Sequence, residues 1–205
     1  MHVDFLVEES SAEVALEALV PRILGNEIAF SCRVFQGKHD LLSKLQARLR
    51  GYADRIRNTG EDLRIVVLID NDDQDCEVLK AELEQMARRA RLWTRGQAQG
   101  RNVRVLNRIA IEELEAWFLG DPTALTTAFP RVPSSYVARA RFRDPDAIRG
   151  GTWEALLRLL QERGYYRTGL PKIEVASKIA THMNIGSNRS SSFNAFCVGL
   201  AAFVA

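Results

Sequence analysis

The spacing of apolar residues predicts four strands in the first 120 residues. Val3, Phe5 and Val7 alternate in the manner of a half-buried strand, and this run stops at Glu8. The unbroken apolar run 65–69, within a strand over 63–69, is what a strand covered on both faces requires. Two further strands are predicted over 28–35 and 103–106.

Apolar residues three and four positions apart predict a helix after each strand. Ser10 and Glu13 have the spacing of a capping box, which would begin the first helix. The four helices are predicted over 10–23, 41–56, 75–90 and 109–119. After a connection rich in proline and arginine, three more helices are expected to begin near Trp153, Pro171 and Ser192.

The alternation of strands and helices predicts the fold class. Strands joined by helices form a mainly parallel sheet with right-handed crossovers and with helices on both faces. We therefore expect an α/β core over residues 1–120 and a basic, mainly helical extension over 121–205, packed on that core. Ligands of such sheets bind beyond the carboxyl ends of the strands.

Acidic residues follow two of the predicted strands. Glu8 follows the first strand, and Asp70, Asp72 and Asp73 follow the third. Carboxylates gathered at one sheet edge repel one another unless a cation or protons lie between them, and oxygen ligands favour Mg²⁺ or Mn²⁺ over zinc. The pattern predicts a Mg²⁺ or Mn²⁺ site. The alternative is that each cluster caps the following helix, with Asp72 or Asp73 capping the third.

A second acidic group follows the fourth strand. Glu112 and Glu115 share one face of the helix predicted at 109–119, and Asp121 comes soon after it. These three residues could complete a second metal position, because phosphodiester hydrolases often use two metal ions. The alternative for Glu115 is an exposed helix carboxylate.

In a phosphodiester hydrolase each of these groups would have a role. Asp70 and Asp72 would hold metal, and Glu8 would be a metal ligand or the general base. Lys38 and Lys172 could each approach a pentavalent phosphate or lie on the surface, and for Lys38 we expect the surface.

Composition narrows the class of protein further. The chain has 205 residues, of which 46% are hydrophobic and 26% charged, and this excludes a disordered or collagen-like protein. Its three cysteines are too far apart for a disulfide framework or a CxxC metal site, and its histidines lack zinc-ligand spacing. The chain start lacks signal-peptide features, and no apolar run approaches the roughly 20 residues that span a bilayer. We expect a cytoplasmic protein with no membrane segment.

The net charge of +2 hides an uneven distribution of charge. Residues 1–120 carry 17 basic and 20 acidic side chains, whereas residues 121–205 carry 11 basic and 6 acidic ones. Seven arginines lie between Arg88 and Arg108 without an acid, and more follow over 139–149. Such stretches can contact a nucleic-acid backbone while an indole stacks on a base, or they can be solvated helix ends and loops. If both groups flank the acids, they form a basic rim around the metal site. The predicted nucleic-acid-binding residues are Arg88, Arg91, Trp93, Arg95, Arg101, Arg104, Arg139, Arg141 and Arg143.

These motifs also carry a resemblance to a known family. A strand ending in Val7-Glu8, then helix, strand, helix and a strand ending in Asp70-Asn71-Asp72, is similar to the Toprim fold of topoisomerases, primases and overcoming-lysogenization-defect nucleases. The whole chain resembles an uncharacterised bacterial family with a Toprim-like core, through LVEESSAE, FQGKHDLL, VVLIDNDDQD, NRIAIEELEAWFLGD, GLPKIEVASKIA and SSSF. The Toprim pattern usually has glycine after the first glutamate, where this chain has Glu9.

The resemblance implies a Mg²⁺-dependent nuclease acting on DNA or RNA, with Glu8, Asp70 and Asp72 at the acidic positions. It also suggests a phage-defence or DNA-processing operon with an ATPase partner. A second hypothesis is a Toprim-like module that binds nucleic acid or a partner without cutting, and Glu9 in place of glycine favours it. A third is a receiver-like phospho-acceptor or phosphatase domain, although Asp70 follows the third strand rather than the first.

Overall fold

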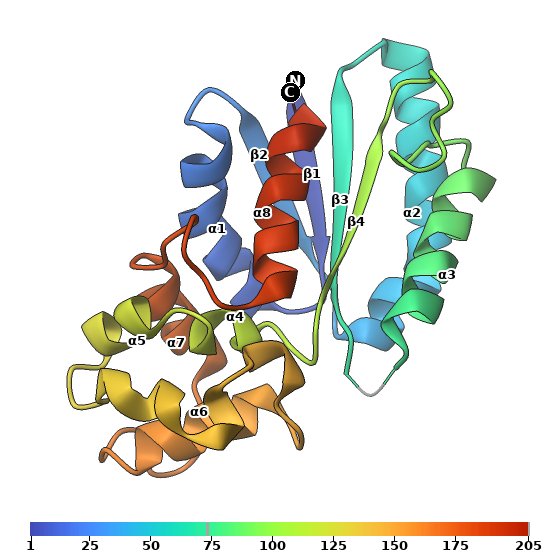
Figure 1. The fold of residues 1–205 in the computed structure, drawn as a ribbon. Coiled ribbons are helices and arrows are strands. Elements are labelled where there is room, and N and C mark those ends of the chain that lie inside the picture. Colours follow the sequence, from blue (N-terminus) through green and yellow to red (C-terminus); the bar gives the residue numbers. More distant parts are fainter. Residues whose placement is uncertain (73, 205) are drawn as a thin grey trace.

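The computed structural model describes residues 1–72 and 74–204, which form an α/β fold around one four-stranded sheet (Figure 1). The strands are β1 (His2–Val7), β2 (Ala29–Val34), β3 (Leu63–Asp70) and β4 (Val105–Ala110). Their order is β2-β1-β3-β4, and all three pairings are parallel. The predicted α/β class with a parallel sheet is therefore confirmed. Asp73, which was a candidate ligand or cap, lies outside the described residues.

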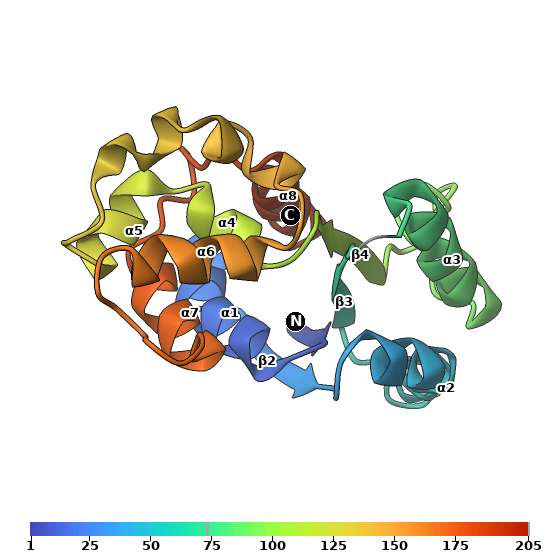
Figure 2. The same cartoon turned by 90° about the horizontal axis from the view of Figure 1, so that it is seen from below.

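Helices cover both faces of the sheet, as Figure 2 shows along the strands. One face carries α1 (Ser10–Leu24) and α8 (Ser191–Val204), and the other carries α2 (Lys38–Thr59) and α3 (Cys76–Arg89). Beyond the carboxyl ends of the strands lie α4 (Glu115–Leu119), α5 (Pro122–Ala128), α6 (Thr152–Gln161) and α7 (Lys172–Ala180), with short 3-10 helices at Ser134–Ala138, Ala140–Phe142 and Pro145–Ala147. The helices expected near Trp153, Pro171 and Ser192 are confirmed. No helix in the described part of the chain is long and apolar enough to cross a membrane.

The central strands are apolar throughout because both of their faces are covered. Phe5 and Val66 point into the core beneath α1 and α8, whereas Leu6 and Val67 point into the core beneath α2 and α3. Successive side chains of a strand point to opposite faces, so a strand between two helical layers needs an unbroken apolar run. This explains why the run 65–69 predicted β3 correctly.

The C-terminal helices share a core with the sheet. Trp117 of α4 is fully buried, and its ring centroid lies 5.3 Å from that of Phe193 and 5.0 Å from that of Phe196, both on α8. The indole nitrogen of Trp117 donates a hydrogen bond of 2.9 Å to Ser192. Residues beyond 121 therefore help to fix α4, which carries part of the candidate site.

The region around β4 differs from the prediction. β4 extends to Ala110, so the helix predicted at 109–119 is reduced to the five residues of α4. Asn107 and Arg108 hide the apolar pattern of β4, which lies at the edge of the sheet, and Glu112 has a φ of 61° that no α-helix allows. Glu112 and Glu115 consequently do not share a helix face.

The predicted helix caps also need correction. The N-cap of α1 is Glu9, and no side chain makes a capping hydrogen bond there, so the capping box of Ser10 and Glu13 is wrong. The N-cap of α3 is Asp75, whose carboxylate accepts hydrogen bonds from the amides of Glu77 and Val78. Because Asp75 caps α3, Asp72 is left for another role.

Candidate functional site

The carboxyl ends of β1 and β3 place Glu8 beside Asp70. The two strands pair in parallel with Val7 opposite Leu68, so the residues that follow emerge at the same edge of the sheet. Glu8 is only 8% exposed, and its Oε1 accepts a hydrogen bond of 2.6 Å from the backbone amide of Asp70. Two acidic residues 62 positions apart thereby form the base of the candidate site.

The first residue of α4 adds a third carboxylate. Glu115 is only 2% exposed, so it is not the exposed helix carboxylate considered from the sequence. A cavity of about 10 Å³ is lined by residues that include Glu8, Asp70, Glu115 and Lys172. This is about the space that one water molecule needs.

Burial and mutual repulsion raise the pKa values of these carboxyl groups. Burial raises the pKa of Glu8 to about 7, and the same cause raises the pKa of Glu115 to about 7. The pKa of Asp70 lies well above its usual range, first because of burial and then because of repulsion from Glu8 and Glu115. At neutral pH the cluster must therefore keep protons or acquire a cation.

Lys172, at the start of α7, is a cation beside this cluster. Its Nζ lies 4.0 Å from Oε1 of Glu115 and 3.4 Å from Oε2 of Glu9. Burial alone would lower the pKa of Lys172, but Glu115 and Glu9 outweigh this effect and raise it. The lysine is therefore charged and faces the acids from the helical side of the site.

Lys38, at the start of α2, also belongs to this edge, and its expected position on the open surface is wrong. Its side chain is only 19% exposed. The Nζ donates to the carbonyl oxygens of Asp70 and Asn71, each at 2.9 Å, and to Oδ2 of Asp72 at 3.2 Å. Lys38 thus holds the loop that follows β3.

The loops after β3 and β4 have unusual backbone conformations. Asp72 has a φ of 49° and Glu112 has a φ of 61°. The amide of Asp72 donates a hydrogen bond of 2.8 Å to the carbonyl oxygen of Glu112, which ties the two loops together. Positive φ is uncommon for residues other than glycine and occurs often at functional sites. The Asp72 carboxylate is half exposed, at the rim of the cluster.

Two acids near the cluster have structural partners. The oxygens of Asp121 accept hydrogen bonds from the amides of Ala124 and Asn184, at 2.9 and 2.6 Å, so we leave this predicted ligand out of the site. Sequence reasoning missed Glu113, whose Oε2 accepts bonds from the amides of Thr152 and Trp153 and from the Thr152 hydroxyl. Glu113 fixes the start of α6, and no local pattern signals partners 39 residues away.

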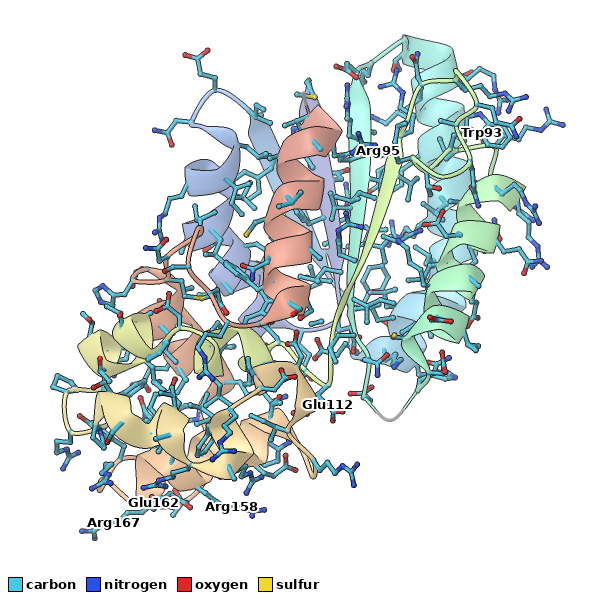
Figure 3. All side chains as sticks on the ribbon, viewed as in Figure 1. Trp93, Arg95, Glu112, Arg158, Glu162 and Arg167 are labelled. Carbon is cyan, nitrogen blue, oxygen red and sulfur yellow. The ribbon has the colours of Figure 1, made fainter. Side chains whose placement is uncertain are left out.

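The first arginine group lies far from the acids. Figure 3 shows Trp93 and Arg95 at the amino ends of the strands, whereas Glu112 lies at the opposite end of the sheet. The expected basic rim is therefore wrong for Arg95 and for Arg101 and Arg104, which line one groove with it. It is also wrong for Arg88 and Arg91, which lie at and just after the end of α3, before Trp93. Of the second group, Arg139 forms an ion pair of 2.7 Å with Glu162. Arg139, Arg141 and Arg143 precede α6, whose start is bonded to Glu113.

The cluster has the carboxylate ligands of a Mg²⁺ site, but they are not arranged around a metal position. Within 1–72 and 74–204, no group of three or more His, Cys, Asp or Glu side chains is arranged to hold a metal ion. Carboxylate oxygens are the ligands that Mg²⁺ prefers, and a divalent cation would offset the repulsion around Asp70. A bound cation would compete with the contact between Glu8 and the Asp70 amide and with that between Lys172 and Glu115.

Glu9 fits its position without strain. Its backbone is extended, with a φ of −138° and a ψ of 158°, which any residue adopts. The glycine of the Toprim pattern is therefore not needed here for backbone reasons. The Glu9 side chain instead forms the ion pair with Lys172.

A comparison with protein families identifies one match. The model of a family described as a domain of unknown function (DUF4276) matches residues 7–201. This range includes the strand ends, α4 and Lys172. No curated protein and no solved structure gives a significant match.

Proposed function

The chain belongs to the DUF4276 family, and we propose that it is a Mg²⁺- or Mn²⁺-dependent phosphodiesterase that cleaves DNA or RNA. The observation that carries this proposal is the buried cluster of Glu8, Asp70 and Glu115, in which burial raises the pKa of each carboxyl. Open parallel sheets bind ligands at this edge. The resemblance of Glu8, Asp70 and Asp72 to the Toprim acidic positions also supports it.

Each residue of the site would have its own role in hydrolysis. Glu8, Asp70 and Asp72 would hold the metal, which when bound stabilises negative charge on phosphate oxygens. Glu115, with a pKa of about 7, can accept a proton from a water in the small cavity as the water oxygen bonds to phosphorus. The bond from phosphorus to the leaving oxygen breaks, and the leaving oxygen takes up the proton. Lys172 keeps Glu115 partly ionised and can contact a substrate phosphate.

Cleavage of plasmid DNA, single-stranded DNA and RNA with Mg²⁺ or Mn²⁺ tests the proposal. We expect Asp70→Asn and Glu8→Gln each to lower the rate by about a thousandfold, within the range for loss of an acid–base or charge-stabilising group. Glu82→Gln is the matched control, because Glu82 is exposed on α3. Cleavage that survives both site variants would refute the proposal.

A second candidate function is binding of nucleic acid without cleavage. It is favoured by the two lysines of the site, because Lys38 contacts Asp72 and Lys172 lies beside Glu115, where each partly replaces a metal ion. In this case nucleic acid binds with a steep salt dependence, and Mn²⁺ does not bind. Calorimetric titration with MnCl₂ separates the two functions.

A further inference from the structure

A large groove lies along the free edge of β4, away from the acidic cluster. β4 is the last strand of the sheet, with α3 over one face and α8 over the other (Figure 2). The groove has a volume of about 810 Å³ and runs between these two helices and the segment 94–104. Its volume lies in the range typical of small-molecule sites.

Basic side chains dominate the lining of this groove. The lining acids are Asp62 and Glu84, and the lining cations are Arg64, Lys80, Arg95, Arg101, Arg104 and Arg108. Asp62 pairs with Arg104 at 2.5 Å, and Glu84 pairs with Lys80 at 3.1 Å. Arg95, Arg101 and Arg108 form no ion pair with any described carboxylate. The groove therefore offers surplus positive charge to an anion.

Arg108 is positioned in the groove by α8. Its guanidinium donates to the carbonyl oxygens of Ala195 and Asn107, at 3.1 and 3.0 Å. The guanidinium lies where a Cβ atom on Gly199 would be, so only glycine at position 199 leaves it this space. Arg108 is held by carbonyl oxygens and has no carboxylate partner in the part of the chain that the structure describes, which suits recognition of a phosphate.

A buried acceptor points to a second feature of the ligand. Asn107 is only 1% exposed and lines the groove. Its Nδ2 donates to Oε1 of Glu84 at 3.0 Å, which fixes the orientation of the amide, and its Oδ1 has no hydrogen-bond partner among the described residues. Leaving a buried acceptor unsatisfied costs about 1–3 kcal/mol, so a ligand with an N–H or O–H donor is favoured here.

We infer that this groove binds a nucleoside phosphate. The phosphates would contact the surplus arginines, and a ribose hydroxyl or base amine would donate to Asn107. A concave site with a deeply buried polar contact suits a small ligand better than an extended nucleic-acid strand. The inference is independent of the proposed cleavage, because the groove and the acidic cluster share no lining residue.

Isothermal titration of the full chain with ATP in EDTA tests the inference. ATP should bind at least about tenfold more tightly than tripolyphosphate, which has no ribose hydroxyl or base amine to donate to Asn107. Asn107→Leu should remove this preference. Absence of ATP binding, or equal affinities for ATP and tripolyphosphate in the unaltered chain, would overturn the inference.

Charge variants distinguish ATP binding in the groove from non-specific attraction of ATP to the positive charge of the protein. Arg95→Gln with Arg101→Gln should weaken ATP binding by about tenfold or more. The matched control is Arg88→Gln with Arg89→Gln, which removes the same charge from exposed positions outside the groove and should change affinity less than about twofold. Equal losses in both double variants, or displacement of ATP by an equimolar single-stranded oligonucleotide, would contradict the inference.

Gly199→Ala gives a test that keeps every charge. The added Cβ would displace the Arg108 guanidinium, and we expect about tenfold weaker ATP binding. Circular dichroism checks that the variant folds. A folded variant with unchanged affinity would exclude a role for Arg108 in the groove.

Discussion

The acidic cluster and the basic groove lie on the same sheet but gather side chains of opposite charge. At the carboxyl ends of β1 and β3, Glu8 and Asp70 are brought close together and burial raises their pKa values. Along the edge of β4, Arg95 and Arg101 remain exposed and without carboxylate partners among the described residues. Bound cations or protons would stabilise the first region, and a bound anion would stabilise the second.

The comparison shows why the net charge of +2 says little about this protein. Glu8 and Asp70 lie close together because parallel strands that are distant in the sequence end at the same edge of the sheet. The arginines before β4 lie at the other end of the sheet (Figure 3). Two sites of opposite charge therefore coexist on one sheet, with no lining residue in common.

The largest expected effect is independent loss of the two activities. Glu8→Gln should lower cleavage about a thousandfold and leave ATP affinity unchanged. Arg95→Gln with Arg101→Gln should weaken ATP binding and leave cleavage of a short oligonucleotide within about twofold. Measuring kcat/KM and ATP affinity on both variants checks this. If either variant impairs both activities, the two regions form one site.

The pH dependence of stability should reveal the acidic cluster. The pKa values of Glu8 and Glu115 are raised to about 7, so the folded state holds protons that the unfolded state has already released. Between pH 4.5 and about 7 the free energy of unfolding should therefore fall as pH rises, by on the order of 3 kcal/mol for each group.

Urea unfolding at pH 5 and pH 7.5 measures this fall. Glu8→Gln should remove the part of the fall that Glu8 contributes, and the control Glu82→Gln should leave the fall intact. If the free energy of unfolding instead rises over this range, and rises equally in Glu8→Gln, the pKa of Glu8 is not raised in the folded protein.

At neutral pH, Mn²⁺ should restore part of the free energy of unfolding that is lost as the pH rises. At a hundred times its Kd, the ion would stabilise the folded state by about 2.7 kcal/mol. Thermal unfolding at pH 7.5 with MnCl₂ or EDTA measures the shift in Tm, which Asp70→Asn should abolish. The same shift in Asp70→Asn would place the bound ion elsewhere.

The smallest effect concerns the loop after β3. Lys38→Met removes the bonds to the carbonyl oxygens of Asp70 and Asn71 and should cost about 1–2 kcal/mol. Lys44→Met is the control on the same helix, because Lys44 pairs with Asp40 at the surface and has no other ion pair among the described residues. Such a pair is worth about 0.5 kcal/mol. Equal losses of stability in the two variants would show that Lys38 does not hold the loop.

The sequence predicted the centre of the sheet and β2 better than the edge strand β4. The run 65–69 is buried on both sides, so its pattern predicted β3 and placed Asp70 at its end. β4 contains Asn107 and Arg108, and its apolar residues merged with those of α4 into an apparent helix. An edge strand tolerates polar residues, so alternation alone could not define it.

The parts of the site that come from distant contacts could not be predicted. Lys38 bonds residues 32 and more positions away, and Lys172 faces Glu9 across 163 positions. The positive φ of Glu112 follows from the loop it enters, not from its residue type. The carboxylates that follow strands could be predicted because strand ends can be predicted. Lys38 and Lys172 were named as candidates, but their contacts with Asp72, Glu9 and Glu115 arise only on folding.

Anomalous scattering from a crystal soaked in MnCl₂ tests the central claim most directly. We expect a manganese peak in contact with the carboxylates of Glu8 and Asp70, with Lys172 or the Glu8 side chain moved from its present position. A map with no peak at these carboxylates, and with Glu8 still bonded to the Asp70 amide, would contradict a metal-dependent site.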